Sequence, residues 1–422
     1  MLFHKMKNHV LMIAFHFPPA AMGSGHLRVL GFVKHLPALG WESTVLSAHV
    51  RAYPRTDTAN EMLIPQDCRV QRVFALDARR HMGFLGKYPA ILAQPDRWIS
   101  WWPAAVWQGL RLIRKYNIRV IWSTYPIMTA HCIANTLSRL TDLPWIADFR
   151  DPVTNSVSIE NRFAASSQSR LEKRVVTRAT HSVFTTPGAM QFYAERYPQI
   201  YREGRMTVIP NGYDEEAFPL NTDTKVHPSG RPLKLLHSGL LYPHGRTPVP
   251  FFMALARLKA SGVIAADRLQ VTLRASGSEA HYAAEINRLD LDDLVTLAPP
   301  ISHRQALTEQ IGADAFLLFQ GGEYDRQIPA KLYEYLRIGR PIFALIGEHG
   351  DTAAVLRDTG GAVIVPLDNA SVIEAQLEVF IRALLEGNGP KANAKIVQKY
   401  SRKEGAVSFA GLLGKVSSQS NP

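Results

Sequence analysis

The chain has little cysteine and no long apolar run, and both features restrict the kinds of protein to which it can belong. Its 422 residues include two cysteines, Cys68 and Cys132, which lie far apart and lack the close spacing of a metal or redox motif. We therefore expect two free thiols in a reducing compartment. The apolar run from Val10 to Phe17 is too short to span a bilayer and has no small-residue cleavage site. These features predict a cytoplasmic protein that is soluble or peripheral on the inner face of the plasma membrane.

Positive charge is in excess but is not concentrated in one segment. The chain carries 48 Lys and Arg against 36 Asp and Glu, a formal net charge of +12. This balance favours an anionic partner, which could be nucleic acid, an acidic lipid surface or a phosphorylated substrate. Because there is no long Lys/Arg run, we expect no nucleic-acid partner.

The order of apolar and amphipathic segments predicts the fold class. The two kinds of segment alternate in two series, separated by the polar stretch Asn221–Arg231. Such alternation is typical of parallel sheets with crossover helices, and the length fits two domains. A helix is expected at Gly25–Leu39, whereas residues 51–99 have an irregular pattern that we do not resolve. We expect an α/β protein with two doubly wound halves and a ligand at the carboxyl ends of the strands.

A glycine-rich turn follows the first expected strand. Pro18 and Pro19 end that strand, and Gly23, Ser24 and Gly25 allow the backbone to come close to a ligand just before a helix. A helix N-terminus in this position can hold a phosphate. Turns of this kind are common, so the pattern alone is not specific.

A polar string, Ala147-Asp-Phe-Arg-Asp-Pro152, ends another expected strand and places Arg150 between Asp148 and Asp151. The two carboxylates could be a metal pair or acid and base groups. Alternatively, Arg150 pairs with its neighbours, shapes the loop and positions a substrate. His131 precedes this string on an expected helix, and the residues alone leave both a packing and a functional role open.

Four of the seven tryptophans gather within Arg97–Trp107, among them Trp101 and Trp102. Aromatic side chains at this density can stack on sugars or insert at a lipid interface. They can equally pack the core. Both interpretations remain open.

The second half contains the most informative stretch, which runs from Ile328 to Ile342. It reads as a loop, a helix carrying Lys331 and Glu334 three residues apart on one face, and an apolar strand. The N-terminus of that helix suits an anion, and a carboxylate beside it can accept the two hydroxyls of a ribose. Upstream, Arg246 follows a strand and a glycine, and a guanidinium can bind phosphate oxygens in a fork.

These motifs, in this order, resemble those of GT-B glycosyltransferases, especially family 4 of the retaining enzymes. The resemblance extends from about Val10 to Val365 and includes the turn Pro210-Asn-Gly-Tyr-Asp214 and the Asp-Phe-Arg-Asp-Pro string of a bacterial subgroup. It implies two Rossmann-like domains facing a central cleft: an acceptor-side domain at 1–210 and a donor-binding domain at 211–394. A final helix, 395–418, would pack back on the first domain or lie frayed at the surface.

The resemblance also implies roles for the donor-binding residues and for His131, and the residue patterns themselves suggest the roles of the others. Donor-diphosphate contacts are expected from Gly23, Ser24, Gly25, Arg246 and Lys331, and the donor ribose from Glu334. Catalytic roles are expected for His131, which would touch the donor sugar, and for Asp148 and Asp151. Arg150, Trp101 and Trp102 would bind the acceptor or shape a loop. No metal site is expected in the protein, no cofactor is required, and any Mg²⁺ would be carried on the diphosphate of the nucleotide-sugar.

Two positions depart from the family pattern. Arg326 stands where the family has the first of two glutamates, and no lysine follows Arg246 before Lys259, so Lys331, Arg326 or Arg274 would supply that charge. The predicted function is transfer of a sugar from a nucleotide-sugar to a glycan or polyprenyl-linked acceptor, with retention, in bacterial surface polysaccharide assembly. The alternatives are a nucleotide-sugar epimerase of GT-B shape and a non-catalytic nucleotide-sugar-binding protein.

Overall fold

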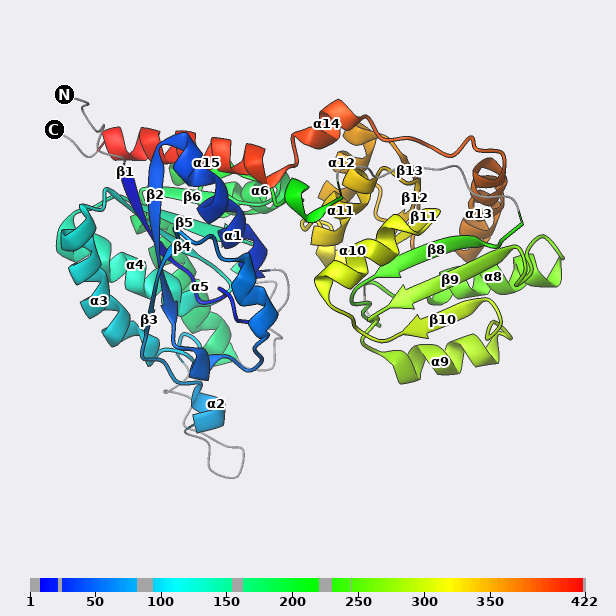
Figure 1. Ribbon diagram of the computed structural model, residues 1–422, viewed down its shortest axis with the longest axis horizontal. Coiled ribbons are helices and arrows are strands. Elements are labelled where there is room, and N and C mark those ends of the chain that lie inside the picture. Colours follow the sequence, from blue (N-terminus) through cyan, green and yellow to red (C-terminus); the bar gives the residue numbers. More distant parts are fainter. Residues whose placement is uncertain are drawn as a thin grey trace. The chain divides into compact units, whose positions relative to one another are not determined.

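The chain folds as two compact α/β units (Figure 1). One comprises Met1–Asn211 together with Arg402–Pro422, and the other comprises Gly212–Ser401. The computed structural model describes residues 8–21, 25–81, 94–153, 162–219, 230–243 and 245–419, and for residues 162–167 and 323 it describes the backbone only. No helix among these residues is both long and apolar enough to cross a membrane.

The first unit contains seven parallel strands in the order β3-β2-β1-β4-β5-β6-β7. Their bounds are β1 Asn8–Ile13, β2 Trp41–Ala48, β3 Arg69–Val73, β4 Val120–Thr124, β5 Trp145–Arg150, β6 His181–Phe184 and β7 Met206–Val208. Val10 of β1 lies opposite both Ser43 of β2 and Val120 of β4. The direction in which strands are added reverses at β1, so the carboxyl ends of β1 and β4 border the switch point, where folds of this kind bind ligands.

Helices cover both faces of this sheet (Figure 1). Their bounds are α1 Gly25–His35, α2 Ala78–His81, α3 Trp101–Tyr116, α4 Met128–Thr141, α5 Arg162–Arg178, α6 Pro187–Arg196, α7 Pro198–Arg202 and α15 Arg402–Ser418. α3 to α6 pack on one face of the sheet, and α1 and α15 pack on the other. Coverage on both faces explains why the β1 side chains from Val10 to Ile13 are apolar and fully buried.

The last helix, α15, completes the core of the first unit beside α1 (Figure 1). The Phe409 ring lies 4.4 Å from that of Phe32 on α1 and 5.7 Å from that of Trp122 on β4, measured between ring centroids. Gly31 permits the close approach, because a Cβ there would lie 2.9 Å from Cδ of Arg402. The tail after residue 393 is therefore two helices, the second of which is a core element of the first unit.

The second unit contains six parallel strands in the order β10-β9-β8-β11-β12-β13. Their bounds are β8 Leu233–Ser238, β9 Leu269–Arg274, β10 Val295–Ala298, β11 Ala315–Gln320, β12 Ile342–Ile346 and β13 Ala362–Val365. Leu235 of β8 pairs with Val271 of β9 and with Ala315 of β11. The strand order reverses at β8, so the switch point of this unit lies at the carboxyl ends of β8 and β11.

Two helical layers enclose the second sheet (Figure 1). α8 (Val249–Ala260), α9 (Glu279–Arg288) and α13 (Ala370–Leu385) pack on one face. α10 (His303–Ile311), α11 (Ala330–Ile338), α12 (Asp351–Thr359) and α14 (Ala394–Gln398) pack on the other. The predicted fold class, α/β with two Rossmann-like parallel-sheet domains, is confirmed.

Several elements differ from expectation, and three of them have a clear local reason. The helix predicted over Gly25–Leu39 ends at His35 and continues as a 3-10 turn, because Pro37 cannot donate the next helical hydrogen bond. β3 lies inside the segment whose pattern was unresolved, and as a half-exposed edge strand it lacks a strong apolar signal. α12 was not expected; its N-cap residue, Gly350, has no side chain that could cap the helix, so the start signal in the sequence is weak.

Candidate functional site

Lys331 reaches the switch point of the second unit from the first turn of α11. Gly239, just after β8, has φ +115, and a Cβ at this position would lie 2.9 Å from Nζ of Lys331. Nζ also lies 2.9 Å from Nε2 of His237, the next-to-last residue of β8. The pKa of Lys331 is lowered to about 7, chiefly by burial and also by Arg246, whereas Glu334 acts in the opposite direction. The amine of this half-buried lysine is thus held close to a backbone position that only glycine leaves open.

Arg246 lies against two tyrosine rings near the same strand ends. Its guanidinium carbon is 4.3 Å from the ring centroid of Tyr324 and 5.3 Å from that of Tyr242, and the two rings are stacked 5.8 Å apart. Gly245 allows this packing, because a Cβ there would lie 2.9 Å from the Tyr324 ring. The N–H of Gly321, after β11, donates to the Gly245 carbonyl at 3.0 Å. The arginine is therefore held by the loops that follow β8 and β11.

Glu334 lies one turn after Lys331 and is bonded through both carboxylate oxygens. Oε1 is 2.9 Å from Nε2 of His303, and Oε2 accepts from Nε2 of Gln310 at 3.3 Å. The Glu334 side chain is 14% exposed and that of His303 is 45% exposed. A ligand hydroxyl can therefore reach this carboxylate by taking over the bond that His303 makes.

The other basic side chains that could bind a diphosphate form ion pairs with carboxylates or are exposed to solvent. Arg274 forms a two-pronged ion pair with Glu309, with nitrogen–oxygen distances of 2.9 and 2.5 Å. Lys259 pairs with Asp290 at 3.0 Å. Arg326, at the position of the missing first glutamate, is exposed. Of the three residues expected to supply the second charge, Lys331 has its amine 2.9 Å from Nε2 of His237 on β8.

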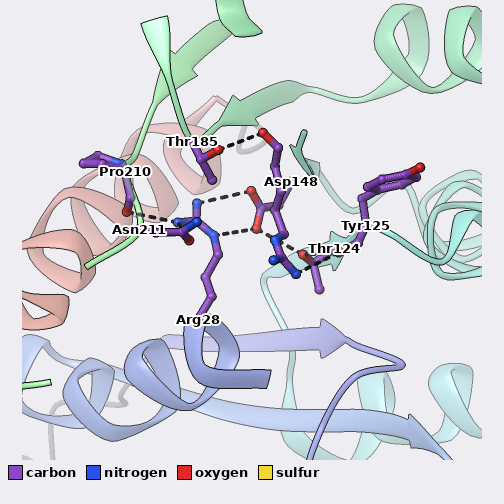
Figure 2. A network of polar contacts seen from close by, with 8 residues as sticks. Arg28, Thr124, Tyr125, Asp148, Thr185, Pro210 and Asn211 are labelled. Atoms are coloured by element: carbon purple, nitrogen blue, oxygen red, sulfur yellow. Dashed lines mark hydrogen bonds and ion pairs between the residues drawn. The ribbon is translucent and has the colours of Figure 1, made fainter. Parts of the chain in front are cut away.

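Arg28 and Asp148 form a buried ion pair in the first unit (Figure 2). Arg28 donates from Nε to Oδ2 of Asp148 at 2.9 Å and from Nη2 to Oδ1 at 3.2 Å, and Thr124 also donates to Oδ2 at 3.2 Å. The remaining nitrogen, Nη1, donates to the carbonyl of Pro210 at 3.1 Å and to Oδ1 of Asn211 at 3.3 Å. Helix α1, strand β5 and the end of the first unit's main segment are therefore joined at one point.

This geometry bears on the three roles that the sequence left open for the carboxylates. Asp148 is fully buried, and both of its oxygens accept hydrogen bonds. That environment favours the loop-shaping alternative over an acid, a base or a metal ligand. Asp151 follows β5 and is half-exposed. Its catalytic role stays a prediction.

Arg150 and His16 converge on the first residue of α1. A Cβ on Gly25 would lie 2.9 Å from both Nη1 of Arg150 and Nδ1 of His16. Arg150 has φ +58; its carbonyl accepts from the Thr185 hydroxyl at 2.9 Å, and its Nη1 approaches the Tyr125 carbonyl at 3.4 Å. A guanidinium at a helix N-terminus suits an anion, as was predicted for the glycine-rich turn.

The imidazole of His16 is neutral at physiological pH. Burial lowers its pKa to about 4, and Arg150 and His26 contribute in the same direction. Its Nε2 is buried and has no hydrogen-bond partner among the described residues. Gly23 and Ser24, predicted to contact a diphosphate, lie outside the described residues.

His131 is part of the core of the first unit. It is fully buried, with Nδ1 2.8 Å from the hydroxyl oxygen of Ser123, and its ring packs against Trp145 and Phe149. Burial lowers its pKa to about 3, so the ring is neutral at physiological pH. The observed contacts are those of a packing residue, and contact with a donor sugar stays a prediction.

The tryptophan cluster divides between core and surface. Trp101 is fully buried, whereas Trp102 is 38% exposed and donates to the Thr136 hydroxyl at 3.1 Å. Trp107 is 56% exposed, and the Arg111 guanidinium carbon lies 3.5 Å from its ring centroid. One face of α3 therefore shows aromatic and basic side chains together. Over the described ranges, no group of three or more His, Cys, Asp or Glu is placed to hold a metal ion.

The first unit resembles a known protein family in sequence, and the whole chain resembles solved structures in fold. Residues 24–212 match the family model described as a Glycosyl transferase 4-like domain. No curated protein matches the chain in sequence. The family match covers most of the first unit and supports a glycosyltransferase.

Solved structures match the chain over nearly its whole length. A sucrose-phosphate synthase from Thermosynechococcus elongatus has a TM-score of 0.66 at 16% identity, with 98% of this chain and 100% of that one covered. HepE from Anabaena, in complex with UDP, has a TM-score of 0.63 at 14% identity, with coverages of 96% and 100%. A candidate UDP-N-acetylglucosamine 2-epimerase from Listeria monocytogenes has a TM-score of 0.54 at 13% identity, with coverages of 96% and 95%. At these identities the likeness concerns the fold, which is GT-B.

Five residues of the second-unit site were not predicted from the sequence: His237, Tyr242, His303, Gln310 and Tyr324. Each acts through a tertiary contact, with Lys331, Arg246 or Glu334. His237 offered the one readable signal, because a polar residue directly before the Ser-Gly turn interrupts an otherwise apolar strand end. Tyr242, His303 and Tyr324 stand on loops or at a helix start, where polar residues are ordinary, and Gln310 lies buried in the last turn of α10.

Proposed function

We propose that this protein transfers a sugar from a nucleoside diphosphate donor to an acceptor hydroxyl. The observation that carries the proposal is the gathering of Arg246, Lys331 and Glu334 around the switch point of the second unit. Two cations and a carboxylate at the open edge of a parallel sheet suit a diphosphate joined to a ribose. The Glycosyl transferase 4-like match over residues 24–212 supports the same class.

Each residue of this group has a proposed part in donor binding. Lys331 and Arg246 bind diphosphate oxygens, and Glu334 accepts the ribose hydroxyls in place of its present bond to His303. The amine and the guanidinium stabilise the charge that develops on the leaving diphosphate. HepE, a neighbour in fold, binds UDP, which makes uracil the first base to test here.

Transfer with retention of the anomeric configuration requires little acid–base chemistry from the protein. The leaving diphosphate itself can take the proton of the acceptor hydroxyl on the same face of the sugar. In this scheme His131 contacts the donor sugar and Asp151 contacts the reacting groups, while Asp148 and Arg150 shape the loop after β5. Gly25, with the turn before it, contributes to holding the diphosphate. Any Mg²⁺ arrives bound to that diphosphate.

The acceptor that we propose is a glycan, free or carried on a polyprenyl lipid, as in bacterial surface polysaccharide assembly. Net charge of +12 and the exposed Trp107–Arg111 face of α3 support contact with an anionic membrane. Cosedimentation with vesicles should be strong with anionic lipid, weak with zwitterionic lipid and reduced by salt. Equal binding to both lipids would contradict the membrane part of this proposal.

The experiment for the donor site is thermal stability against UDP, GDP, ADP, dTDP and their sugar conjugates. Binding to the folded state at about 100 times Kd adds about 2.7 kcal/mol of stability, which raises the melting temperature. Glu334→Ala should abolish the shift, whereas Glu378→Ala, which removes an ion pair on α13, should retain it. The absence of any shift in folded protein would contradict the transferase proposal.

Turnover separates the remaining alternatives, since candidate epimerases share this fold. Release of nucleoside diphosphate that depends on an added acceptor supports transfer. Conversion of a nucleotide-sugar to its epimer without acceptor identifies an epimerase. Binding without turnover over a broad acceptor panel identifies a binding protein, the outcome that Arg326 at the first-glutamate position favours.

A further inference from the structure

His237 is a fully buried histidine whose two ring nitrogens are both engaged. Nδ1 lies 2.9 Å from the carbonyl oxygen of Leu317 on β11. Because a carbonyl can only accept, Nδ1 carries the hydrogen and Nε2 is left as an acceptor. Nε2 lies 2.9 Å from Nζ of Lys331, which donates to it. A continuous line of hydrogen bonds therefore runs from α11 through the end of β8 to β11.

The core does not explain why this residue is a histidine. The ring packs edge-on against Phe319, with centroids 5.2 Å apart, and a leucine or phenylalanine would meet that packing requirement. Burying a polar ring costs free energy unless both nitrogens are bonded. The bond to Leu317 satisfies Nδ1, and the amine of Lys331 is the side-chain partner that the structure places at Nε2.

We propose that His237 is a positioning residue, which holds the amine of Lys331 at the carboxyl end of β8 so that it meets a phosphate oxygen of the donor. This inference rests on the proposed function. A long, flexible lysine side chain loses rotamer freedom when a ligand fixes it, and holding it in advance removes part of that loss. Gly239 supplies the space and His237 supplies the anchor.

The electrostatic surroundings of Lys331 give a readout that a purely structural role would not move. The groups that face its amine are His237 from β8, Arg246 from the loop after β8 and Glu334 on α11 itself. Burial lowers the pKa of Lys331 to about 7, so above that pH much of the free protein carries a neutral amine there. A bound diphosphate raises that pKa, so binding takes up a proton and weakens as pH rises above 7.

A matched pair of substitutions separates the two bonds of the histidine. The amide of Gln reaches the position of Nε2, so His237→Gln retains an acceptor for Lys331. The amide of Asn reaches only the position of Nδ1, so His237→Asn retains the bond to Leu317 and loses the anchor. We expect UDP affinity within about threefold of the parent for His237→Gln and weaker by about tenfold or more for His237→Asn.

The test is calorimetric titration with UDP, in buffers of different ionisation enthalpy, of the parent protein, His237→Gln, His237→Asn, Lys331→Met and the double variant. If His237 acts through Lys331, adding His237→Asn to Lys331→Met causes no further loss, and Lys331→Met takes up fewer protons on binding than the parent protein. Independent losses, or His237→Asn binding as tightly as His237→Gln, would overturn the inference while leaving the donor site in place. If the folded parent protein binds no nucleoside diphosphate, the proposed function fails and this inference fails with it.

Discussion

Replacing Arg28 by methionine tests whether the buried ion pair holds the first unit together. The substitution leaves the Asp148 carboxylate fully buried, with the 3.2 Å bond from Thr124 as its one remaining hydrogen bond in the described network. It also removes the two bonds that tie the chain at Pro210 and Asn211 to α1. We expect the unfolding free energy of the first unit to fall.

The magnitude follows from the burial of both partners. Their side chains are 5% and 0% exposed, and breaking such a pair from one side costs about 3–5 kcal/mol, because an uncompensated charge stays buried. Removing both partners, as in Arg28→Met with Asp148→Leu, leaves no such charge. The double variant should therefore be more stable than Arg28→Met alone, with a coupling of about 2–3 kcal/mol.

Tryptophan fluorescence reports this unit selectively. All seven tryptophans lie between Trp41 and Trp145, within the first unit, so urea unfolding followed by their emission is not mixed with that of the second unit. Arg69→Met is the matched control, since it removes an ion pair to Glu42 that is 43% and 34% exposed, and should cost at most about 1 kcal/mol.

Two results would refute the reasoning about the ion pair. One is an Arg28→Met variant that loses no more than the Arg69→Met control. The other is a double variant whose loss equals the sum of the single losses, because independent effects would mean that the two side chains do not stabilise each other.

Three further predictions concern single residues. Gly239→Ala should weaken UDP binding at least tenfold, because the added Cβ would displace the amine of Lys331. The control is Gly262→Ala, which is also at positive φ but has no neighbouring atom within 4 Å of an added Cβ, and this variant should bind UDP normally. Equal binding by both variants would contradict the close approach at Gly239. Burial lowers the pKa of His131 to about 3, so below pH 6.5 the unfolded chain takes up a proton that the folded chain does not, and stability falls as the pH drops. His131→Leu should therefore reduce the slope of the unfolding free energy against pH by up to about 1.4 kcal/mol per pH unit. An unchanged slope would contradict this. Phe409→Ala should cost the first unit about 3–5 kcal/mol by tryptophan fluorescence, because it opens a cavity between α15 and α1, and a loss under about 1 kcal/mol would show that the unit does not depend on α15.

The fold could be predicted because local patterns carry it. Apolar runs of strand length alternate with amphipathic segments, so the helix expected between Ile328 and Ile342 is found as Ala330–Ile338, and the apolar strand expected after it is found as Ile342–Ile346. β3 and α12 were not expected. A half-exposed edge strand and a helix without a capping side chain leave weak local signals, and their positions are decided by neighbours far away in the chain.

The candidate site was only partly accessible from the sequence. Lys331 and Glu334 could be named because three residues of helix put both on one face near its N-terminus, and Arg246 because it follows a strand and a glycine-rich turn. The partners of these residues, His237, His303 and Gln310, come from other elements. Nothing in their local sequence shows that they will meet.

The sequence by itself therefore determined the class of fold and the edge of each sheet where chemistry is expected, because strand and helix periodicity and the direction of parallel strands are local properties. Only the tertiary structure decided what the charged groups do there. In that structure Asp148 forms an ion pair with Arg28, His131 lies in the core, and the amine of Lys331 is hydrogen-bonded to His237. Charge pairing and burial depend on which distant segments pack together, and that contact, rather than the residue type, sets the state of each ionisable group.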